Sequence, residues 1–380
     1  MRLVSAWPFI LFGLAFSAMV CLHFLLAYRA WRATREETST NIDPDYVRVE
    51  DYFARSFRQK VDNWFQLPSR AAAPDGTRTI TKGSELIRIS YEAEFPPQST
   101  SEDIQIVQGD FRCRAGCVFH REICVHGDAF IGPGTRMQAI AVDGNLTLDA
   151  GVRVARWADS TGDMEIGAHS IVKARVTSGQ SVYLHEGVQV QSVFAPAVRS
   201  LQKQSGMSST VGNPPAPEME LPGQGTDAGR TGKRGGVEWK KFSRLSPECW
   251  LYDGDLNPDV PCRVTTKLIV KGKCVLAPGS VLEGDLKADG RIVIGEGSVC
   301  KGNVIAGGEI RFAPGSRFLG VVHAGKTIRL CRGVVGGASG AKVAAYAADT
   351  LWLDEDVLVH GKLASADRVV VTEQAVRRSK

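Results

Sequence analysis

Five soft side chains within fourteen residues are the densest candidates for chemistry in this sequence: Cys113, Cys117, His120, Cys124 and His126. Thiolates and imidazoles are the ligands that zinc prefers in proteins, so this segment could hold a zinc ion. A buried cysteine, however, is more often a small apolar side chain than a ligand. The sequence around these residues repeats, and the repeat explains the cysteines as small apolar side chains. We therefore predict no metal site.

The repeat assigns each cysteine a structural position. Cys113 falls where the next coil has Ile131, and Cys117 falls where later coils have small residues such as Ser280. Cys124 falls where other coils have apolar residues such as Ala141. With nine cysteines, an odd number, in a chain of 380 residues, we expect reduced thiols rather than a disulfide framework.

The repeat is carried by glycines at spacings of 17 or 18 residues. Its members are Gly109, Gly127, Gly144, Gly162, Gly179, Gly254, Gly272, Gly290, Gly308 and Gly325. A second glycine series follows about seven residues later, and proline precedes three of its members, as in Pro278-Gly279. Proline followed by glycine is typical of a type II turn.

Between the two glycine series, apolar residues stand at the second and fourth positions, as in Ile292 and Ile294. This alternation predicts a short strand with one face inward. One such strand cannot bury its apolar face alone, whereas coils stacked about 4.8 Å apart share a continuous core. We therefore predict an all-β fold, a β-solenoid of about twelve coils with about 18 residues per coil.

A low-complexity segment divides the repeat. Residues 201–236 are rich in Gly and Pro and are expected to be disordered. The two solenoid blocks could form one rod with a long loop, or two rods on a tether. The expected organisation is residues 1–35, an anchor with a basic flank; 36–77, a helix and linker; 78–198, the first block; 199–236, the linker; 237–376, the second block; and 377–380, a tail.

The first residues predict a membrane anchor. Residues 7–27 carry no formal charge and would form a helix roughly 32 Å long. The expected lipid-facing residues are Trp7, Phe9, Leu14, Phe16, Leu22, Phe24, Leu26 and Tyr28. Arg29, Arg32 and Arg35 follow the segment, which favours a single-pass inner-membrane protein with a cytoplasmic C-terminal domain. The alternative is a cleaved signal peptide, but the apolar run is long for one.

A second helix is expected after this anchor. Asp43 and Pro44 are typical of a helix start. The apolar residues that follow, from Tyr46 to Trp64, recur at spacings of three and four, which predicts one apolar face. Such a helix could lie on anionic lipid, through residues such as Arg58, or pack on the solenoid as an end cap.

No motif for catalysis or for a cofactor is present: we find no P-loop, no paired-carboxylate motif and no Gly-x-Ser-x-Gly. We therefore predict no catalytic residues, no cofactor, and no nucleotide or nucleic-acid binding, and we expect that the protein is not an enzyme. One rival is open, because hexapeptide acyltransferases also have 18-residue coils and a catalytic histidine. Apolar residues do recur every six residues between Leu276 and Phe318, although a sustained Ile-Gly hexad is missing.

Residues 268–325 resemble the bactofilins, the polymer-forming cytoskeletal proteins of bacteria. The resemblance lies in turns such as Gly279-Ser280 and Gly297-Ser298, which are followed by Gly284-Asp285 and Gly302-Asn303. It implies a right-handed β-helix that stacks end to end, without nucleotide, into filaments on membranes and serves as a platform for cell-envelope proteins. The expected function is thus a membrane-anchored cytoplasmic scaffold that self-associates, with membrane lipid and cell-envelope proteins as partners. The alternatives are an acyltransferase-like enzyme and an extracytoplasmic adhesion protein.

Overall fold

Short strands joined by tight turns form a β-solenoid of about 14 coils, spaced about 18 residues apart. The computed structural model describes residues 49–65, 76–201, 219–221 and 233–372, together with residues 17, 19 and 24. The unit that contains the solenoid spans Phe53–Lys380. The predicted β-solenoid and its period are confirmed, and at a rise of about 4.8 Å per coil the stack is roughly 65–70 Å long.

The predicted membrane-spanning helix, and with it the single-pass inner-membrane location, is corrected by the structure. In the part of the chain that the structure describes, no helix combines the length and the apolar character needed to cross a membrane. Nearly all of residues 7–27, and all of Arg29, Arg32 and Arg35, lie outside the described residues.

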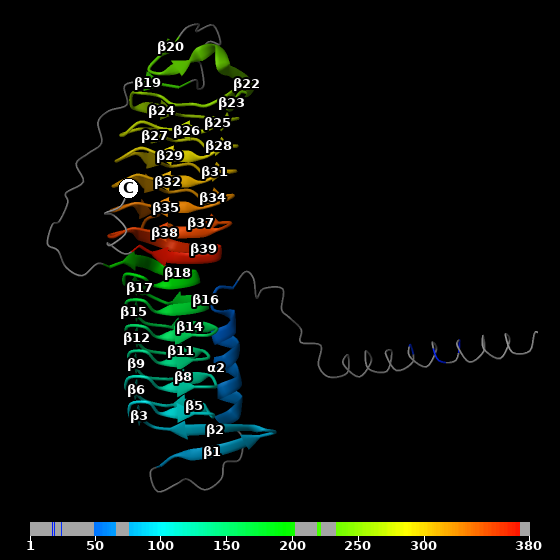
Figure 1. Cartoon of the computed structure of the whole chain (residues 1–380), viewed down its shortest axis with the longest axis vertical. Coiled ribbons are helices and arrows are strands. Elements are labelled where there is room, and N and C mark those ends of the chain that lie inside the picture. Colours follow the sequence, from blue (N-terminus) through cyan, green and yellow to red (C-terminus); the bar gives the residue numbers. More distant parts are fainter. Residues whose placement is uncertain are drawn as a thin grey trace, which may run out of the picture. The chain divides into compact units, whose positions relative to one another are not determined.

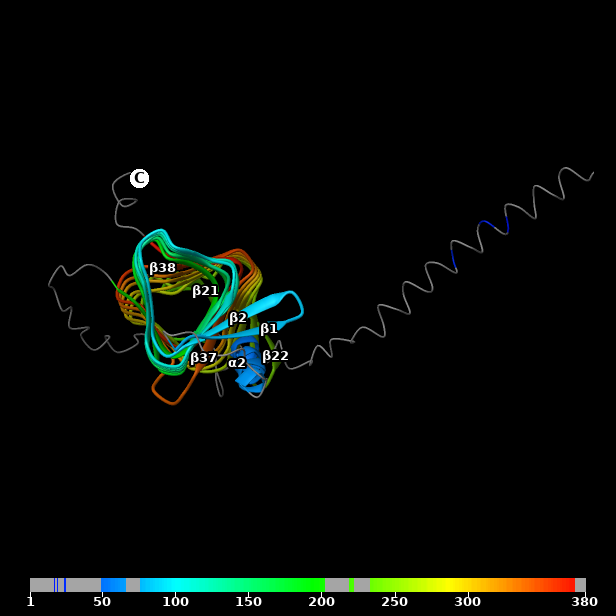
Figure 2. The same cartoon turned by 90° about the horizontal axis from the view of Figure 1, so that it is seen from below.

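Each coil is a rounded triangle, seen along the stack in Figure 2. Three parallel sheets, which we name A, B and C, run the length of each half of the solenoid, because each strand pairs with the equivalent strand one coil further on. Each half has seven coils in the described residues, counted as seven strands of its C sheet. The two halves are joined end to end (Figure 1).

The first half begins with an antiparallel hairpin, β1 (Arg78–Lys82) and β2 (Glu85–Ser90). Its A sheet contains β3 (Ala93–Phe95), β6 (Phe111–Cys113), β9 (Ala129–Ile131), β12 (Leu146–Leu148), β15 (Met164–Ile166), β17 (Ser181–Leu184) and the end of β18 (Gln189–Ser200). Its B sheet contains β4 (Thr100–Ser101), β7 (Val118–Phe119), β10 (Arg136–Met137), β13 (Arg153–Val154) and the starts of β16 (Ile171–Ser178) and β18. Its C sheet contains β2, β5 (Ile104–Val107), β8 (Ile123–Val125), β11 (Ile140–Val142), β14 (Trp157–Ser160), β16 and β18.

The second half repeats this plan, beginning with an antiparallel hairpin of β22 (Phe242–Ser246) and β23 (Cys249–Tyr252). Its A sheet contains β26 (Cys274–Val275), β29 (Ile292–Ile294), β32 (Ile310–Phe312), β35 (Ile328–Leu330), β38 (Thr350–Leu353) and the end of β39 (Leu358–Val371). Its B sheet contains β24 (Cys262–Val264), β27 (Val281–Leu282), β30 (Val299–Cys300), β33 (Arg317–Phe318), β36 (Val335–Gly336) and the start of β39. Its C sheet contains β23, β25 (Lys267–Val270), β28 (Leu286–Ala288), β31 (Val304–Ala306), β34 (Val322–Ala324), β37 (Val343–Ala347) and β39.

The glycine ladder forms one corner of the triangle, where consecutive backbones come into direct contact. The Gly127 N–H donates to the carbonyl oxygen of Gly109 at 3.1 Å, and Gly144 does the same to Gly127. A Cβ atom on Gly127 would lie 2.6 Å from the carbonyl carbon of Gly109, closer than real Cβ contacts. The second glycine series has positive φ, for example 75° at Gly279, which glycine adopts without strain.

Helix α2 (Tyr52–Phe65) packs lengthwise along the C sheet of the first half (Figure 1). Its buried residues Ala54, Phe57, Val61 and Trp64 form a second apolar cluster with outward-facing residues of that sheet, among them Ile106. Of the two expected locations, contact with the solenoid is therefore observed, along a side rather than over an end. The expected helix start at Asp43 and Pro44 lies outside the described residues.

Three further short strands lie near the start of the second half. They are β19 (Met219–Glu220), which pairs with β24, and β20 (Lys233–Arg234) and β21 (Val237–Glu238), which pair with each other. A short 3-10 helix, η2 (Trp239–Lys241), follows. β19 falls inside the segment expected to be a linker, and it is ordered there because Met219 and Leu221 bury their side chains in the solenoid core.

Candidate functional site

The junction between the two halves is formed by the last coil of each. β18 and β39 pair antiparallel, with Val190 opposite Val369, Val193 opposite Leu363 and Val198 opposite Val359. All of these side chains are buried, and a single apolar core runs through both halves. The two blocks therefore form one rod rather than two rods on a tether, and within it they stack at their C-terminal coils.

The antiparallel pairing gives the junction an approximate twofold arrangement. The C sheets of both halves meet each other, as shown by the pair Val193 and Leu363. The start of β18, in the B sheet of the first half, pairs with the end of β39, in the A sheet of the second half, and the reverse pairing joins Arg199 to Leu358. Each edge that the first half leaves open thus finds a partner edge on the second half.

Side chains close the junction at its rim. The Ser200 hydroxyl donates to the carbonyl oxygen of Asp354 at 2.7 Å and accepts a hydrogen bond from the Val357 N–H at 3.0 Å. The Asp354 carboxylate, 6% exposed, accepts a hydrogen bond from Arg329 at 3.1 Å. Nδ1 of His360 donates to the carbonyl oxygen of Pro196 at 2.9 Å. The two halves are therefore joined by side-chain hydrogen bonds as well as by strand pairing.

The two outer ends of the solenoid differ from each other. At the second end, Met219, Leu221, Val237 and Trp239 are buried and cover the core. At the first end, β3 and β4 each pair with one strand only among the described residues, and Phe95 is only partly buried against Phe111 and Phe119. The first end is thus the more open of the two.

A polar cluster fastens helix α2 to the C sheet of the first half. Arg58 donates to Asp143 at 2.7 Å, to Asp159 at 2.5 Å and to the carbonyl oxygen of Val142 at 2.9 Å. Nδ1 of His126 lies 2.6 Å from Asp143, and this hydrogen bond raises the pKa of His126 above its ordinary 6.5. The same hydrogen bond, assisted by Arg58, lowers the pKa of Asp143 below its ordinary 3.8. The sequence indicated the basic helix, but nothing in its pattern indicated these acidic partners.

The soft side chains of the candidate zinc segment do not converge. Cys113 and Cys117 belong to the solenoid core, Cys124 faces outward beneath α2, and His120 lies beside Glu102. Burial raises the pKa of the Cys113 thiol to about 11 and that of Cys124 to about 12. Within the described ranges, no three His, Cys, Asp or Glu side chains are grouped so that they could hold a metal ion.

His169, His185, His323 and His360 lie on four different coils. Nε2 of His185 lies 2.7 Å from Glu165, and the ring of His323 stacks on Tyr346 with centroids 5.3 Å apart. His169 takes a positive φ of 58° in a turn. His185 thus contacts a carboxylate and His323 an aromatic ring, and neither partner is a serine, threonine or cysteine nucleophile.

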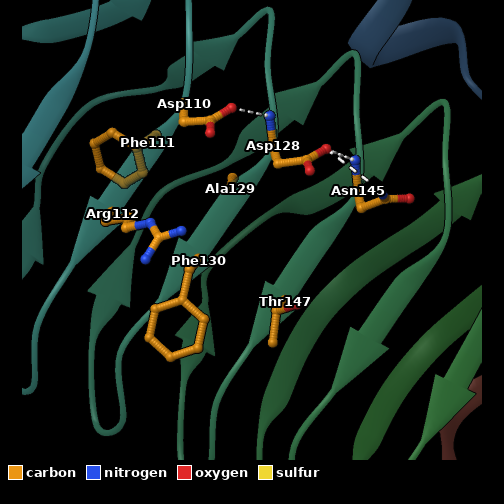
Figure 3. A pocket seen from close by; sticks show the side chains of 8 residues that line it. All are labelled: Asp110, Phe111, Arg112, Asp128, Ala129, Phe130, Asn145 and Thr147. Atoms are coloured by element: carbon orange, nitrogen blue, oxygen red, sulfur yellow. Dashed lines mark hydrogen bonds between the residues drawn. The ribbon is translucent and has the colours of Figure 1, made fainter.

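A surface hollow of about 320 Å³ lies over the A sheet of the first half (Figure 3). Its lining residues are Asp110, Phe111, Arg112, Asp128, Ala129, Phe130, Asn145 and Thr147. One oxygen of Asp110 accepts the Asp128 N–H at 3.0 Å, and one oxygen of Asp128 accepts the Asn145 N–H at 2.7 Å. These carboxylates therefore join successive coils at a corner, which is a structural role.

In the structure, the ten repeat glycines contact the backbone of neighbouring coils. The features that could serve a function are the junction between the halves, the two outer ends and the contact of α2 with the C sheet. Sequence reasoning missed the junction and the Arg58 cluster. Comparisons with protein-family models, with curated proteins and with solved structures found no match to this chain.

Proposed function

We propose that this protein is a structural scaffold, without catalytic activity, whose solenoid ends associate. The observation that carries the proposal is the junction of β18 with β39, where two seven-coil solenoids already stack end to end within one chain. An exposed strand edge pairs readily with another edge, and here β18 pairs along much of its length with β39, with two register shifts, while the paired valine and leucine side chains are buried. The resemblance of residues 268–325 to the bactofilins supports the same proposal.

Association between copies would use the first outer end. The second end is covered by residues such as Leu221 and Val237, and the C-terminal coils are consumed in the internal junction. A molecule with a single associating end forms dimers rather than an open filament. In a twofold dimer the same surface of both copies is buried, so that no surface is left for a third copy. We therefore propose a dimer joined through the β3 and β4 edges, with cell-envelope proteins as candidate partners of the scaffold.

The test is sedimentation of the full chain over a wide concentration range, combined with negative-stain electron microscopy. We expect a reversible monomer–dimer equilibrium and rods of two lengths, the longer about twice the shorter. A chain that stays monomeric at every concentration would remove self-association from the proposal. Extended filaments would contradict the proposed dimer but would still support end-to-end association of the solenoids.

A matched pair of variants locates the interface. Thr100 in β4 and Ser243 in β22 are both exposed and lie at opposite ends. Lysine on a strand edge opposes pairing with another edge. Thr100→Lys should weaken the dimer, whereas Ser243→Lys should leave it unchanged; the opposite result would assign the interface to the second end.

A further inference from the structure

The C sheets of the two halves occupy equivalent positions, but among the described residues only the first of them has a helix on its outer surface. Counted from the opening hairpin of each half, Ile305 in the second half corresponds to Ala141 in the first, and His323 corresponds to Asp159. In the first half, Ala141 is buried beneath α2. In the second half, Ile305 is 38% exposed.

Exposed apolar side chains gather on this uncovered sheet of the second half. Of the large apolar residues that the described chain exposes, Ile305 and Tyr346 lie on this sheet, and Leu319 and Val321 lie just before its strand β34. Ile305 and Tyr346 lie on either side of His323 in adjacent strands, because both are its register partners. Val321 lies directly before β34 and, like His323, is exposed. We name this set, including His323, the C2 patch.

The charge around the C2 patch is the reverse of that beneath α2. In the first half, Asp159 and Asp143 accept hydrogen bonds from Arg58 of the helix. In the second half, His323 replaces Asp159, and the exposed Lys287 lies next to Ile305 in the strand above, where the first half has Cys124. A helix that bound here as α2 binds its own sheet would need a carboxylate where α2 carries Arg58.

This reversal decides between possible occupants. Helix α2 of a second copy would bring Arg58 toward Lys287, with no carboxylate at the position of His323 to receive it, and like charges placed together at an interface are costly. An amphipathic helix recognises a groove through apolar residues at spacings of three, four and seven, and α2 shows that a C sheet of this solenoid accepts such a face. We propose that the C2 patch is a docking site for an acidic amphipathic helix of a partner protein.

The experiment uses the full chain and two helix-stapled, fluorescent peptides with the sequence of residues 50–65. One keeps Arg58 and the other carries Arg58→Glu. We expect the Arg58→Glu peptide to bind at least about tenfold more tightly in fluorescence anisotropy, a difference of about 1.4 kcal/mol. Failure of the Arg58→Glu peptide to bind, or equal binding of both peptides, would overturn the proposal.

Variants of the protein locate the binding and test its charge. Ile305→Glu should reduce binding of the Arg58→Glu peptide about tenfold, while Trp352→Glu, at an exposed apolar residue of the A sheet, should not change it. The double variant Lys287→Glu, His323→Asp should reverse the preference toward the Arg58 peptide. Equal loss in the Ile305 and Trp352 variants, or an unreversed preference, would place the peptide elsewhere and contradict a C2 site.

Discussion

Val193 and Leu363 face each other across the junction, both fully buried, although they come from opposite halves of the chain. Their pairing means that the last coil of each half serves as the end cap of the other. Stability of the two halves should therefore be coupled through this contact.

Leu363→Ala should uncouple the halves. Removing a buried leucine side chain costs about 2–5 kcal/mol, and here the loss falls on the contact that joins two cores. We expect a lower unfolding midpoint in urea and a second, separate transition, followed by circular dichroism. Leu245→Ala, at an exposed leucine, is the control and should change the midpoint little. Equal effects of the two substitutions would contradict a coupled junction.

Arg58→Ala should loosen helix α2 while leaving the solenoid folded. The substitution removes the hydrogen bonds from Arg58 to Asp143 and Asp159, and we expect a loss of about 3 kcal/mol, because Asp159 is 6% exposed and Arg58 is 21% exposed. Hydrogen exchange in residues 52–65 should accelerate, while exchange in β29 and β32 stays slow. Lys60→Ala, at an exposed position of the same helix, is the control.

The attachment of α2 should depend on pH through His126 and Asp143. The pKa of His126 is raised, so its contribution to stability is complete below pH 6.5 and is lost as pH rises through the raised value. The pKa of Asp143 is lowered, so its contribution is present above pH 3.8 and is lost as pH falls through the lowered value.

Stability of the contact should therefore be greatest between these limits. His126→Gln should lower the melting temperature at about pH 5.5 and leave it nearly unchanged at about pH 9, where the wild-type imidazole is neutral. Differential scanning fluorimetry of both proteins measures this difference. A deficit that is the same at both pH values would show that the charge of His126 does not contribute.

The core thiols should be inert in the folded protein. Burial raises the pKa of Cys262 to about 11 and that of Cys300 to about 12, from 9.0, so the reactive thiolate is at least about 100-fold rarer than in an exposed cysteine. Alkylation with iodoacetamide, mapped by mass spectrometry, should label these residues only after unfolding. The partly exposed Cys249 is the internal control. Rapid labelling of Cys300 in the native protein would contradict its burial.

The glycines of the two series should respond differently to alanine. Gly134→Ala meets no atom within 4 Å and only forces a residue with a side chain to a φ of 69°, at a cost of about 1–2 kcal/mol. Gly127→Ala places its Cβ against the backbone of Gly109, which cannot move without disturbing a coil. We expect Gly127→Ala to be the more destabilising in urea unfolding, and the reverse order would contradict the corner contact.

The coils could be predicted from the sequence, because each one repeats the same local requirements: glycine at a crowded corner and apolar residues such as Ile292 and Ile294 facing inward. The direction in which the two blocks stack is not encoded in any repeating pattern of the sequence. The pairing of Val193 with Leu363 depends only on two edges being apolar and complementary, and many arrangements satisfy that condition. The repeat therefore predicted the coils but not their junction.

The candidate site was harder to predict for a related reason. The apolar stripe of α2 predicted a helix with one buried face, but Arg58 was compatible with lipid or with solvent. Its partners Asp143 and Asp159 lie in different coils, and acidic residues at surface positions of a strand are ordinary. Only the folded structure shows that Asp159 is buried, and this burial distinguishes a fastening contact from a solvated charge.

The stacking of C-terminal coil on C-terminal coil also imposes an order on biosynthesis. A ribosome completes β18 long before β39. The strand edge of β18 therefore stays uncovered while the second half is translated, beginning with the coil that lies farthest from the junction. Nascent chains on one messenger would carry the same bare edge at high local concentration. Chaperone engagement, or transient exchange between neighbouring nascent chains, would therefore be concentrated at β18.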